Sequence, residues 1–425
     1  MSVTELVALA RTQGMRVCEL DGVATVFDPG TGRYFVVSEV SGSETELVNH
    51  ELTEFAHLVL KDPELDSSLL GPVMRVDVPH ANQRLILERM QVRTFVSSFF
   101  QEASELALNQ EMTSFDISLA GKVVRIEVPR FDADFRISLQ EAFFGTVAEP
   151  GVKPDFTISI IDSTNGPRSF ELGFDWDWHL PLGVVDSVRT DPYRIAIDRH
   201  TQSISVFSPK EGKCVVWMPS YRDIPYWSAA TPLRLQLSWI ADSLGSEFIH
   251  AAAVKVGEKA LLFAGLSGSG KSTLALRLAQ LGFPLLGDDF LLAEGEKVTA
   301  VYRRLKVHDW AAARVLPNSW TVLNPHGVNE KRIVDPGNEL YTEELPIGAI
   351  VIPTVGEQFS IEPMTGGQAL AALAPPTISG LLGGNESSLE RLAAIAAGAP
   401  CYSLVVEESL LNDPVLLHKL ANLGM

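Results

Sequence analysis

Apolar and polar positions follow two different periods along this chain. Segments such as FDISLAGKVVRIEVP (115–129) and DFTISIID (155–162) alternate at every second residue, which is typical of strands with one buried face. Residues 3–13 and 232–247 instead repeat their apolar positions every three or four residues, which predicts helices. The mixture of the two periods indicates an α/β (α+β) chain.

A length of 425 residues favours two or three compact units. The segment GVATVFDPGTGRYFVVS (22–38) predicts a hairpin, because Pro and Gly residues separate two apolar runs. Residues 44–61 return to a helical pattern. We expect a small α/β N-terminal unit of unassigned role, a β-rich middle region and a C-terminal domain, at residues 1–84, 85–230 and 231–425.

The C-terminal region alternates short apolar runs with amphipathic ones. AAAVKV (251–256), ALLFAG (260–265) and FPLLG (283–287) predict buried strands, and STLALRLAQLG (272–282) predicts a helix that stops at its glycine. Further strands are expected at GAIVIP and YSLVVE. Two more helices are expected, at 387–397 and 413–422.

Charge and cysteine content limit the possible partners. The formal net charge is −19, and a strongly acidic chain is a poor match for nucleic acid or an anionic membrane surface. Cys18, Cys214 and Cys401 lie far apart and suit a reducing compartment. No run approaches the roughly 18 apolar residues of a membrane-spanning helix, and the start lacks a signal-peptide pattern. We therefore expect a cytoplasmic location.

The strongest chemical signal is GLSGSGKS at residues 265–272, which fits G-x-x-x-x-G-K-[ST] at every fixed position. The glycines let successive backbone N–H groups turn toward an anion, and Lys271 adds a full charge. A glycine- and serine-rich turn that matches by chance is the alternative, but here a strand precedes the motif and a helix follows it. The expected nucleotide-binding residues are Gly265, Ser267, Gly268, Ser269, Gly270, Lys271, Ser272 and Thr273.

Two further candidates flank this motif. Asp288 and Asp289 follow the predicted strand 283–287, where a carboxylate beside a phosphate loop commonly holds magnesium and a second one can accept a proton. The alternative is an acidic turn with a helix-capping aspartate. His250 precedes the strand 251–256, and by itself it is better explained by a core or edge position than by a catalytic role.

The block FIHAAAVKVGEKALLFAGLSGSGKSTLALRLAQLGFPLLGDDFLLAEG (248–295) resembles the C-terminal kinase domain of bacterial HPr kinase/phosphorylase and its relatives. The resemblance implies an HPr kinase/phosphoenolpyruvate-carboxykinase-like P-loop domain that uses ATP and Mg²⁺, behind β-rich N-terminal regions. It implies that Lys271 holds the β and γ phosphates and that Ser272 helps to bind magnesium. It further implies roles for Asp288 as the base, Asp289 as a metal-side carboxylate and His250 beside the phosphates.

Two departures from that family concern the acceptor. Thr273 stands where the family commonly has glutamate, and the family's later glycine-rich signature has no clear counterpart. In its place, Lys306, Lys331 and Arg332 are candidates for a phosphate clamp, or form a solvated basic loop. We therefore expect an HPr-kinase-like enzyme with a substrate other than HPr.

The leading hypothesis is transfer of the γ-phosphoryl group of ATP to a hydroxyl of a protein serine, a modified peptide or a small metabolite. A nucleotide-gated adaptor or ATPase in a peptide-maturation cluster is the second hypothesis, and a carboxykinase-like small-molecule enzyme is the third. The expected partners are a nucleotide and the acceptor, with no nucleic acid and no membrane. The resemblance also implies a homo-oligomer.

Overall fold

The computed structural model confirms a mixed α/β chain, in which helices accompany four sheets among the described residues. The structure describes residues 3–21, 23–28, 33–38, 73–76, 89–130, 133–144, 152–163, 185–190, 193–198, 203–224, 226–309, 311–312, 316–317, 319–324, 331–336, 340–341, 343–381 and 387–424.

The first sheet is antiparallel, in the order β1-β2-β3-β4. The helix expected at 3–13 and the two strands of the hairpin at 22–38 are confirmed, whereas the hairpin turn and the helix expected at 44–61 lie outside the described residues. The elements are α1 (Val3–Thr12), β1 (Arg16–Leu20), β2 (Val23–Asp28), β3 (Arg33–Ser38) and β4 (Val73–Val76).

The second sheet has the order β5-β6-β7-β11-β10-β9-β8. β7 pairs in parallel with β6 and β11, and the other neighbours pair antiparallel. Its strands are β5 (Met112–Leu119), β6 (Lys122–Pro129), β7 (Phe156–Asp162), β8 (Val185–Thr190), β9 (Tyr193–Asp198), β10 (Ser203–Ser208) and β11 (Lys213–Met218). The turn between β5 and β6 falls at Ala120 and Gly121, which both have positive φ, as a tight two-residue hairpin requires.

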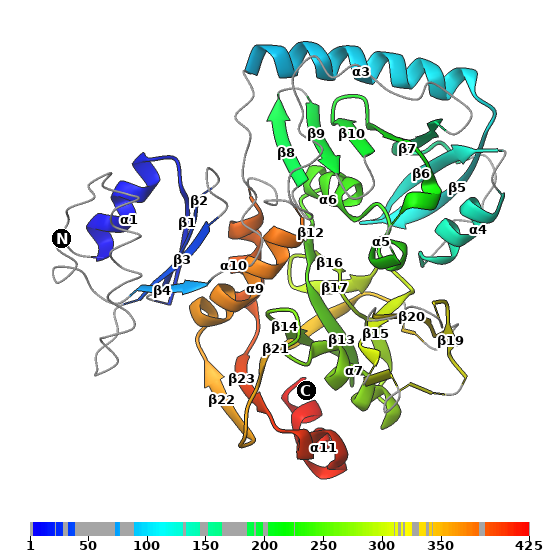
Figure 1. The fold of residues 1–425 in the computed structure, drawn as a ribbon. Coiled ribbons are helices and arrows are strands. Elements are labelled where there is room, and N and C mark those ends of the chain that lie inside the picture. The colour runs from blue at the N-terminus through cyan, green and yellow to red at the C-terminus, as the bar shows by residue number, and fades with distance from the viewer. Residues whose placement is uncertain are drawn as a thin grey trace.

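The expectation of a mostly β region from residue 85 is wrong at its start, where α3 (Arg89–Asn109) runs for 21 residues. Val96, Phe99, Phe100 and Ala103 are buried at helical spacing and pack on one face of the second sheet. Figure 1 shows α3 lying across that sheet. A second unexpected helix, α4 (Ala133–Glu141), buries Phe135 and Leu139 against the opposite face.

The third sheet has nine strands, on the path β12-β16-β17-β21-β14-β13-β15, with β23 paired to β21 and β22 to β23. Every C-terminal strand expected from the sequence is present in it. The strands are β12 (Glu247–Ile249), β13 (Ala251–Val256), β14 (Lys259–Ala264), β15 (Leu285–Gly287), β16 (Leu291–Glu294), β17 (Lys297–Ala300), β21 (Leu345–Val355), β22 (Ser360–Met364) and β23 (Cys401–Val406). A small sheet, in the order β18-β20-β19, consists of β18 (Leu305–Val307), β19 (Thr321–Val322) and β20 (Arg332–Asp335).

The helices expected in the C-terminal region are confirmed, but the helix expected at 232–247 is shorter. It begins only after Leu233, whose φ of 55° is left-handed, and it ends before Gly245. α9 was not expected, and it contains two prolines, Pro375 and Pro376. The helices are α5 (Tyr226–Ala230), α6 (Arg234–Ser243), α7 (Lys271–Gln280), α9 (Gly366–Gly380), α10 (Ser388–Gly398) and α11 (Pro414–Ala421), with short 3₁₀ helices at Tyr221–Asp223, Glu408–Asn412 and Asn422–Gly424. No helix in the described part of the chain has the length and apolarity to cross a bilayer.

Segments far apart in the sequence share hydrophobic clusters. The inner face of the second sheet packs with Leu237 and Ile240 of α6, and with Phe290 and Tyr302 of the C-terminal region, so the expected boundary near 230 falls inside one continuous cluster. Phe27 of β2 packs among residues of α9, α10 and the third sheet. In Figure 1, the first sheet accordingly lies beside α9 and α10.

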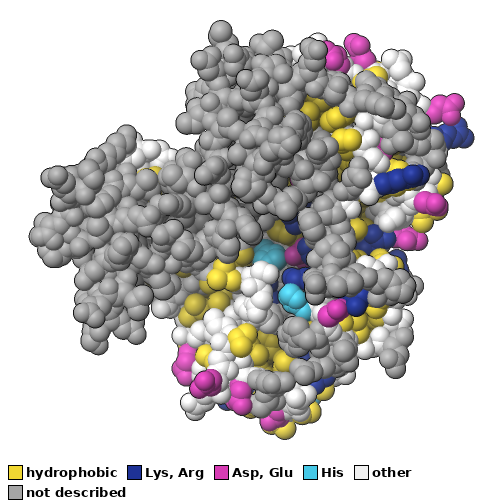
Figure 2. Space-filling view, in the orientation of Figure 1, with side chains coloured by type: hydrophobic (Ala, Val, Ile, Leu, Met, Phe, Trp, Pro, Cys, Tyr) yellow, Lys and Arg dark blue, Asp and Glu magenta, His cyan; other side chains and the backbone are white. Residues whose placement is uncertain are grey.

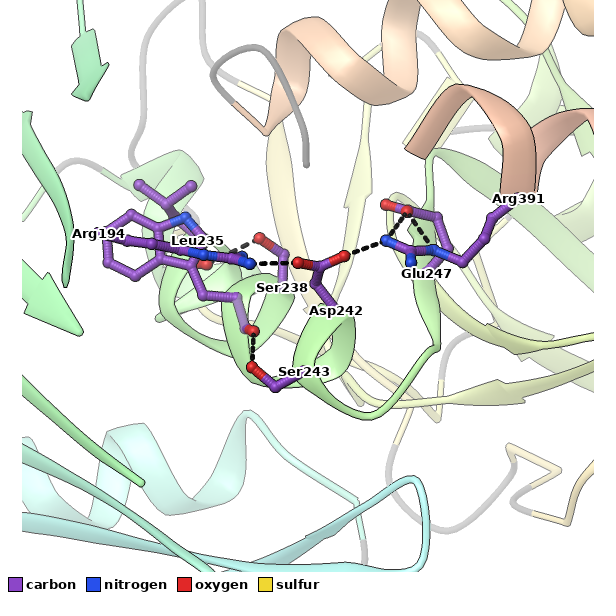
Figure 3. Close-up of polar contacts among 8 residues, drawn as sticks. Arg194, Leu235, Ser238, Asp242, Ser243, Glu247 and Arg391 are labelled. Atoms are coloured by element: carbon purple, nitrogen blue, oxygen red, sulfur yellow. Dashed lines mark hydrogen bonds and ion pairs between the residues drawn. The ribbon is translucent and has the colours of Figure 1, made fainter. Parts of the chain in front are cut away.

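A buried network of charged side chains connects α6 to the second sheet and to α10 (Figure 3). Asp242 of α6 forms ion pairs with Arg194 of β9 on one side and Arg391 of α10 on the other. Arg391 also donates to Glu247 at 3.0 Å. Because each charged side chain of this network contacts one of opposite charge, the network can be buried.

Candidate phosphate-binding site

The phosphate loop, residues 265–272, connects the end of β14 to the start of α7. Gly265, Gly268 and Gly270 have φ values of 122°, 86° and 102°, conformations that residues with a Cβ rarely adopt. These glycines allow the chain to curl between a buried strand and a buried helix. The backbone conformation therefore explains why the motif has glycine at these three positions.

The loop carries several hydrogen-bond donors that an anion would use. The N-cap of α7 is Gly270, which has no side chain to accept from the first N–H groups of the helix. The Ser269 hydroxyl is buried without a hydrogen-bond partner among the described residues. Lys271 Nζ donates to the loop's own carbonyl oxygens, of Gly265 at 2.7 Å and of Leu266 at 2.9 Å. An anion at this point would accept from the helix N–H groups and the Ser269 hydroxyl, and would attract the charge of Lys271.

Ser272 and Asp288 connect the loop to the adjacent strand. Asp288 follows the last residue of β15, and β15 pairs with β13 in the sheet that carries the loop. The Ser272 hydroxyl donates to Asp288 Oδ1 at 2.7 Å. Asp288 is only 5% exposed. The residues predicted for the metal and for the base are therefore in direct contact.

Asp289 reaches the same region because the chain turns there. Its φ of 72° ends the extended conformation, so two successive side chains need not point to opposite faces. Lys306 Nζ lies 2.5 Å from Asp289 Oδ2, and Thr231 donates to the same oxygen at 3.3 Å. The contact of Ser272 is with Asp288, and the two residues expected to share a metal, Ser272 and Asp289, are not hydrogen-bonded to each other in the described structure.

His250 lies on the Asp289 side of the site. Its Nδ1 is 3.5 Å from Asp289 Oδ1 and makes no hydrogen bond within the described residues. Its backbone N–H donates to the Thr377 hydroxyl of α9, and its ring packs against Phe290 at 5.2 Å between centroids. Burial, together with the charge of Lys271, lowers the pKa of His250 to about 3, so the ring is neutral.

The two aspartates have pKa values displaced in opposite directions. Burial, and then the charge of Asp289, raises the pKa of Asp288. Burial by itself would raise the pKa of Asp289, but the charges around it, with that of Lys306 the largest, together lower the pKa. Burial lowers the pKa of Lys271 to about 8. Displaced pairs of this kind are typical of sites with acid–base chemistry.

Four residues of this region carried no sequence signal that we recognised: Thr231, Arg234, Tyr302 and Thr377. Their distance from the motif in sequence explains this, since only the tertiary fold brings them to Asp289 and His250. Figure 2 shows histidine, acidic and basic side chains gathered near the middle of one face. The site therefore combines charges of both signs.

The three basic residues expected as a phosphate clamp behave differently. Lys306 is 10% exposed and pairs with Asp289. The charge of Lys331 contributes to the lowered pKa values of Lys271 and Lys306. Arg332 instead pairs with Asp309 and donates to the backbone oxygen of Asn324. Lys306 thus belongs to the site and Lys331 acts on it electrostatically, whereas Arg332 is held in the small sheet and its loops.

The described residues contain no group of three or more His, Cys, Asp or Glu side chains that could by itself hold a metal ion. Magnesium characteristically binds through one or two carboxylates together with substrate phosphates, so the donor set of Ser272 and Asp288 fits an ion that arrives with a nucleotide. No protein-family model matches the chain, and no curated protein has a matching sequence.

Proposed function

We propose that this chain is an HPr-kinase-like phosphotransferase, which uses Mg²⁺ and ATP to phosphorylate a hydroxyl group. The observation that carries the proposal is the 2.7 Å hydrogen bond from Ser272 to Asp288, which joins the end of a phosphate loop to a buried carboxylate. Nucleotide-dependent phosphoryl transfer requires these two parts side by side.

The hydrogen-bond donors of the loop support triphosphate as the anion. On binding, Lys271 would exchange the carbonyl oxygens of Gly265 and Leu266 for phosphate oxygens, gaining an opposite charge in place of a neutral acceptor. The uncapped start of α7 and the buried Ser269 hydroxyl would donate to the same phosphates. This arrangement concentrates positive charge locally in a chain with a net charge of −19.

Ser272 would hold Mg²⁺ together with phosphate oxygens, with the Asp288 carboxylate beside it. The bound ion would neutralise charge on the transferred phosphoryl group. Because Lys306 and Thr231 occupy Oδ2 of Asp289, we assign Asp289 a different role from the expected metal ligand. Asp289 fixes Lys306 in the site, and Lys306 stabilises charge on the phosphoryl group as it moves.

Asp288 is the better proton acceptor of the two aspartates, since its pKa is raised while that of Asp289 is lowered. In the reaction, the acceptor oxygen forms a bond to the γ-phosphorus as the bond from that phosphorus to the bridging oxygen breaks. ADP leaves with the electron pair of the broken bond, and the hydroxyl proton passes to Asp288. His250, neutral and buried beside Asp289, would donate a hydrogen bond to the phosphoryl group.

The proposal is tested by measuring nucleotide binding and γ-phosphoryl transfer separately, with ATP labelled in its γ-phosphate and a panel of hydroxyl acceptors. Lys271→Met should abolish nucleotide binding, whereas Asp288→Asn should bind MgATP and lose transfer by about a hundredfold or more. Lys297→Met, an exposed lysine paired with Glu344, is the matched control. Nucleotide binding by the wild type with label passing to no acceptor would favour the nucleotide-gated adaptor.

A further inference from the structure

Arg234 has an unusual position for an arginine. It is the first residue of α6, and its guanidinium lies 5.5 Å from the centre of the Phe290 ring, which also packs against His250. The charge of Arg234 contributes to the lowered pKa of both Asp289 and Lys306. Arg234 therefore lies at the edge of the site proposed for phosphoryl transfer.

The described structure gives Arg234 no ion-pair partner and no hydrogen-bond acceptor, in contrast to Arg194 and Arg391. A cation at the first position of a helix also faces the positive end of the helix dipole, which is unfavourable. Its favourable interactions are the aromatic contact with Phe290 and the electrostatic attraction to Asp289. Helix stability therefore does not account for an arginine at this position.

The contacts of residues 288–290 give the site two ends. Asp288 accepts a hydrogen bond from Ser272 of the phosphate loop. Phe290, two residues further on, instead contacts Arg234 and His250. We name the region of Arg234, Asp289 and Tyr302 the distal end.

A second observation at the distal end also points to a missing ligand. Tyr302 is 1% exposed, and its hydroxyl has no hydrogen-bond partner among the described residues. A buried hydroxyl without a partner is uncommon in folded proteins and calls for an explanation such as an absent ligand. Tyr302 belongs to the same hydrophobic cluster as Phe290, whose ring the Arg234 guanidinium contacts.

We propose that the acceptor of the phosphoryl group carries a carboxylate, and that Arg234 binds this carboxylate at the distal end. The inference rests on the proposed function and specifies its substrate class as hydroxy acids, whether free or as the end of a peptide. The planar fork of a guanidinium matches a carboxylate with two parallel hydrogen bonds. A singly charged carboxylate is repelled less by the neighbouring triphosphate and by Asp289 than a doubly charged phosphate ester would be.

The test uses the full chain with Mg²⁺ and a non-hydrolysable ATP analogue, and two probes that differ only in charge. N-acetyl-L-serine has a hydroxyl and a carboxylate, and N-acetyl-L-serinamide has the hydroxyl alone. We expect N-acetyl-L-serine to raise the unfolding temperature of the nucleotide complex and the amide to leave it unchanged. Glycerol 3-phosphate, as a phosphate-bearing hydroxyl compound, should have a smaller effect than the carboxylate.

Arg234→Gln should remove the shift caused by N-acetyl-L-serine, and Arg234→Lys should retain only part of it, because lysine keeps the charge and loses the fork. Arg130→Gln, at a side chain that is 71% exposed, should keep the full shift. Nucleotide affinity and unfolding temperature without probe, measured in parallel, separate loss of this binding site from misfolding.

Equal shifts with both serine probes, no shift with either, a larger shift with glycerol 3-phosphate, or a carboxylate shift that survives in Arg234→Gln would each overturn the inference. In all four cases normal binding of the nucleotide analogue leaves the proposed function intact. Failure of the wild type to bind the analogue would overturn the proposed function and this inference together.

Discussion

The backbone N–H of His250 donates a hydrogen bond to the hydroxyl of Thr377 at 3.0 Å, across 127 residues of sequence. Thr377 lies in α9, whose first residue, Gly366, donates its backbone N–H to Asp21 at 2.9 Å. Near the other end of the helix, a Cβ at Gly380 would meet the Phe290 ring at 2.8 Å. α9 therefore contacts the first sheet at one end and the candidate site at the other.

Thr377→Val keeps the shape of the side chain and removes the oxygen that accepts from His250. Because Thr377 is fully buried, the backbone N–H of His250 loses its partner without gaining water, and we expect a loss of about 1–3 kcal/mol of stability. Transfer activity should fall further than nucleotide binding does, since the displaced residue is on the Asp289 side. Thr377→Ser, which keeps the oxygen, should resemble the wild type in denaturant unfolding and in activity.

Asp288→Asn should stabilise the chain in the absence of nucleotide. The sign follows from the raised pKa of Asp288: a carboxyl group with a raised pKa in the folded state favours folding when neutral, and this contribution is lost as pH rises through the folded pKa. At neutral pH an asparagine avoids that loss and still accepts from Ser272, so a gain of about 1 kcal/mol is expected. Thermal unfolding checks it, and a decrease in stability would contradict it.

Asp289→Asn should have the opposite effect, although it changes the neighbouring residue in the same way. It leaves the buried Lys306 ammonium without its counter-charge, a loss of about 3–5 kcal/mol for a pair of this kind. Backbone strain does not complicate the comparison, because asparagine tolerates the positive φ of this position as well as aspartate. Adding Lys306→Met to Asp289→Asn should restore part of the stability, and chemical denaturation of the three variants provides the test.

The pKa of Lys271, about 8 in the free chain, predicts a pH dependence of nucleotide binding. A triphosphate binds the charged ammonium, so affinity should be constant below this pKa. Above it affinity should fall, approaching about tenfold for each pH unit, because the amine must then take up a proton on binding. Calorimetry between about pH 7 and about pH 9 in buffers of different ionisation enthalpy should detect this proton uptake. Affinity that stays flat across this range would exclude Lys271 from contact with the phosphates.

Glu247 predicts a second pH effect, on stability alone. Burial raises its pKa from 4.5 to about 7 despite the nearby Arg391. The stabilising contribution of its neutral form is fully present below pH 4.5 and is lost as pH rises through about 7. Glu247→Gln lacks this loss, so the stability of the variant relative to the wild type should increase across that window and then level off. Urea unfolding at several pH values measures the difference.

The period of the apolar positions was enough to predict most strands and the helix after the phosphate loop, because each buries a face whose spacing is visible in the sequence. β14 and α7 are examples, with Leu261, Phe263, Leu274 and Leu278 almost fully buried. Local signals failed where tertiary packing decides the conformation. Pro375 and Pro376 argue against a helix, yet α9 is covered on several sides by the third sheet, α10 and the first sheet.

The same distinction between local sequence signals and tertiary packing applies to the residues of the candidate site. Residues that act through a contiguous motif, such as Lys271 and Ser272, could be predicted because the backbone conformation itself demands the motif's glycines. The pairing of Asp289 with Lys306, and the position of Arg234 beside Phe290, depend on how separate elements pack together. No spacing rule in a single sequence encodes such contacts. The segment that resembles HPr kinases also ends before Lys306.

The contact between the first sheet and α9 has a consequence for biosynthesis. Ribosomes make the chain from its N-terminus, so β1 and β2 emerge more than 300 residues before the helix that Asp21 contacts, at a sequence separation of 345. Until α9 and α10 have been made, the apolar surface around Phe27 lacks the part of its cover that these two helices supply. Part of the apolar surface of the early strands therefore stays exposed to solvent through most of translation. We expect chaperones to bind this segment, and we expect it to aggregate when synthesis stalls.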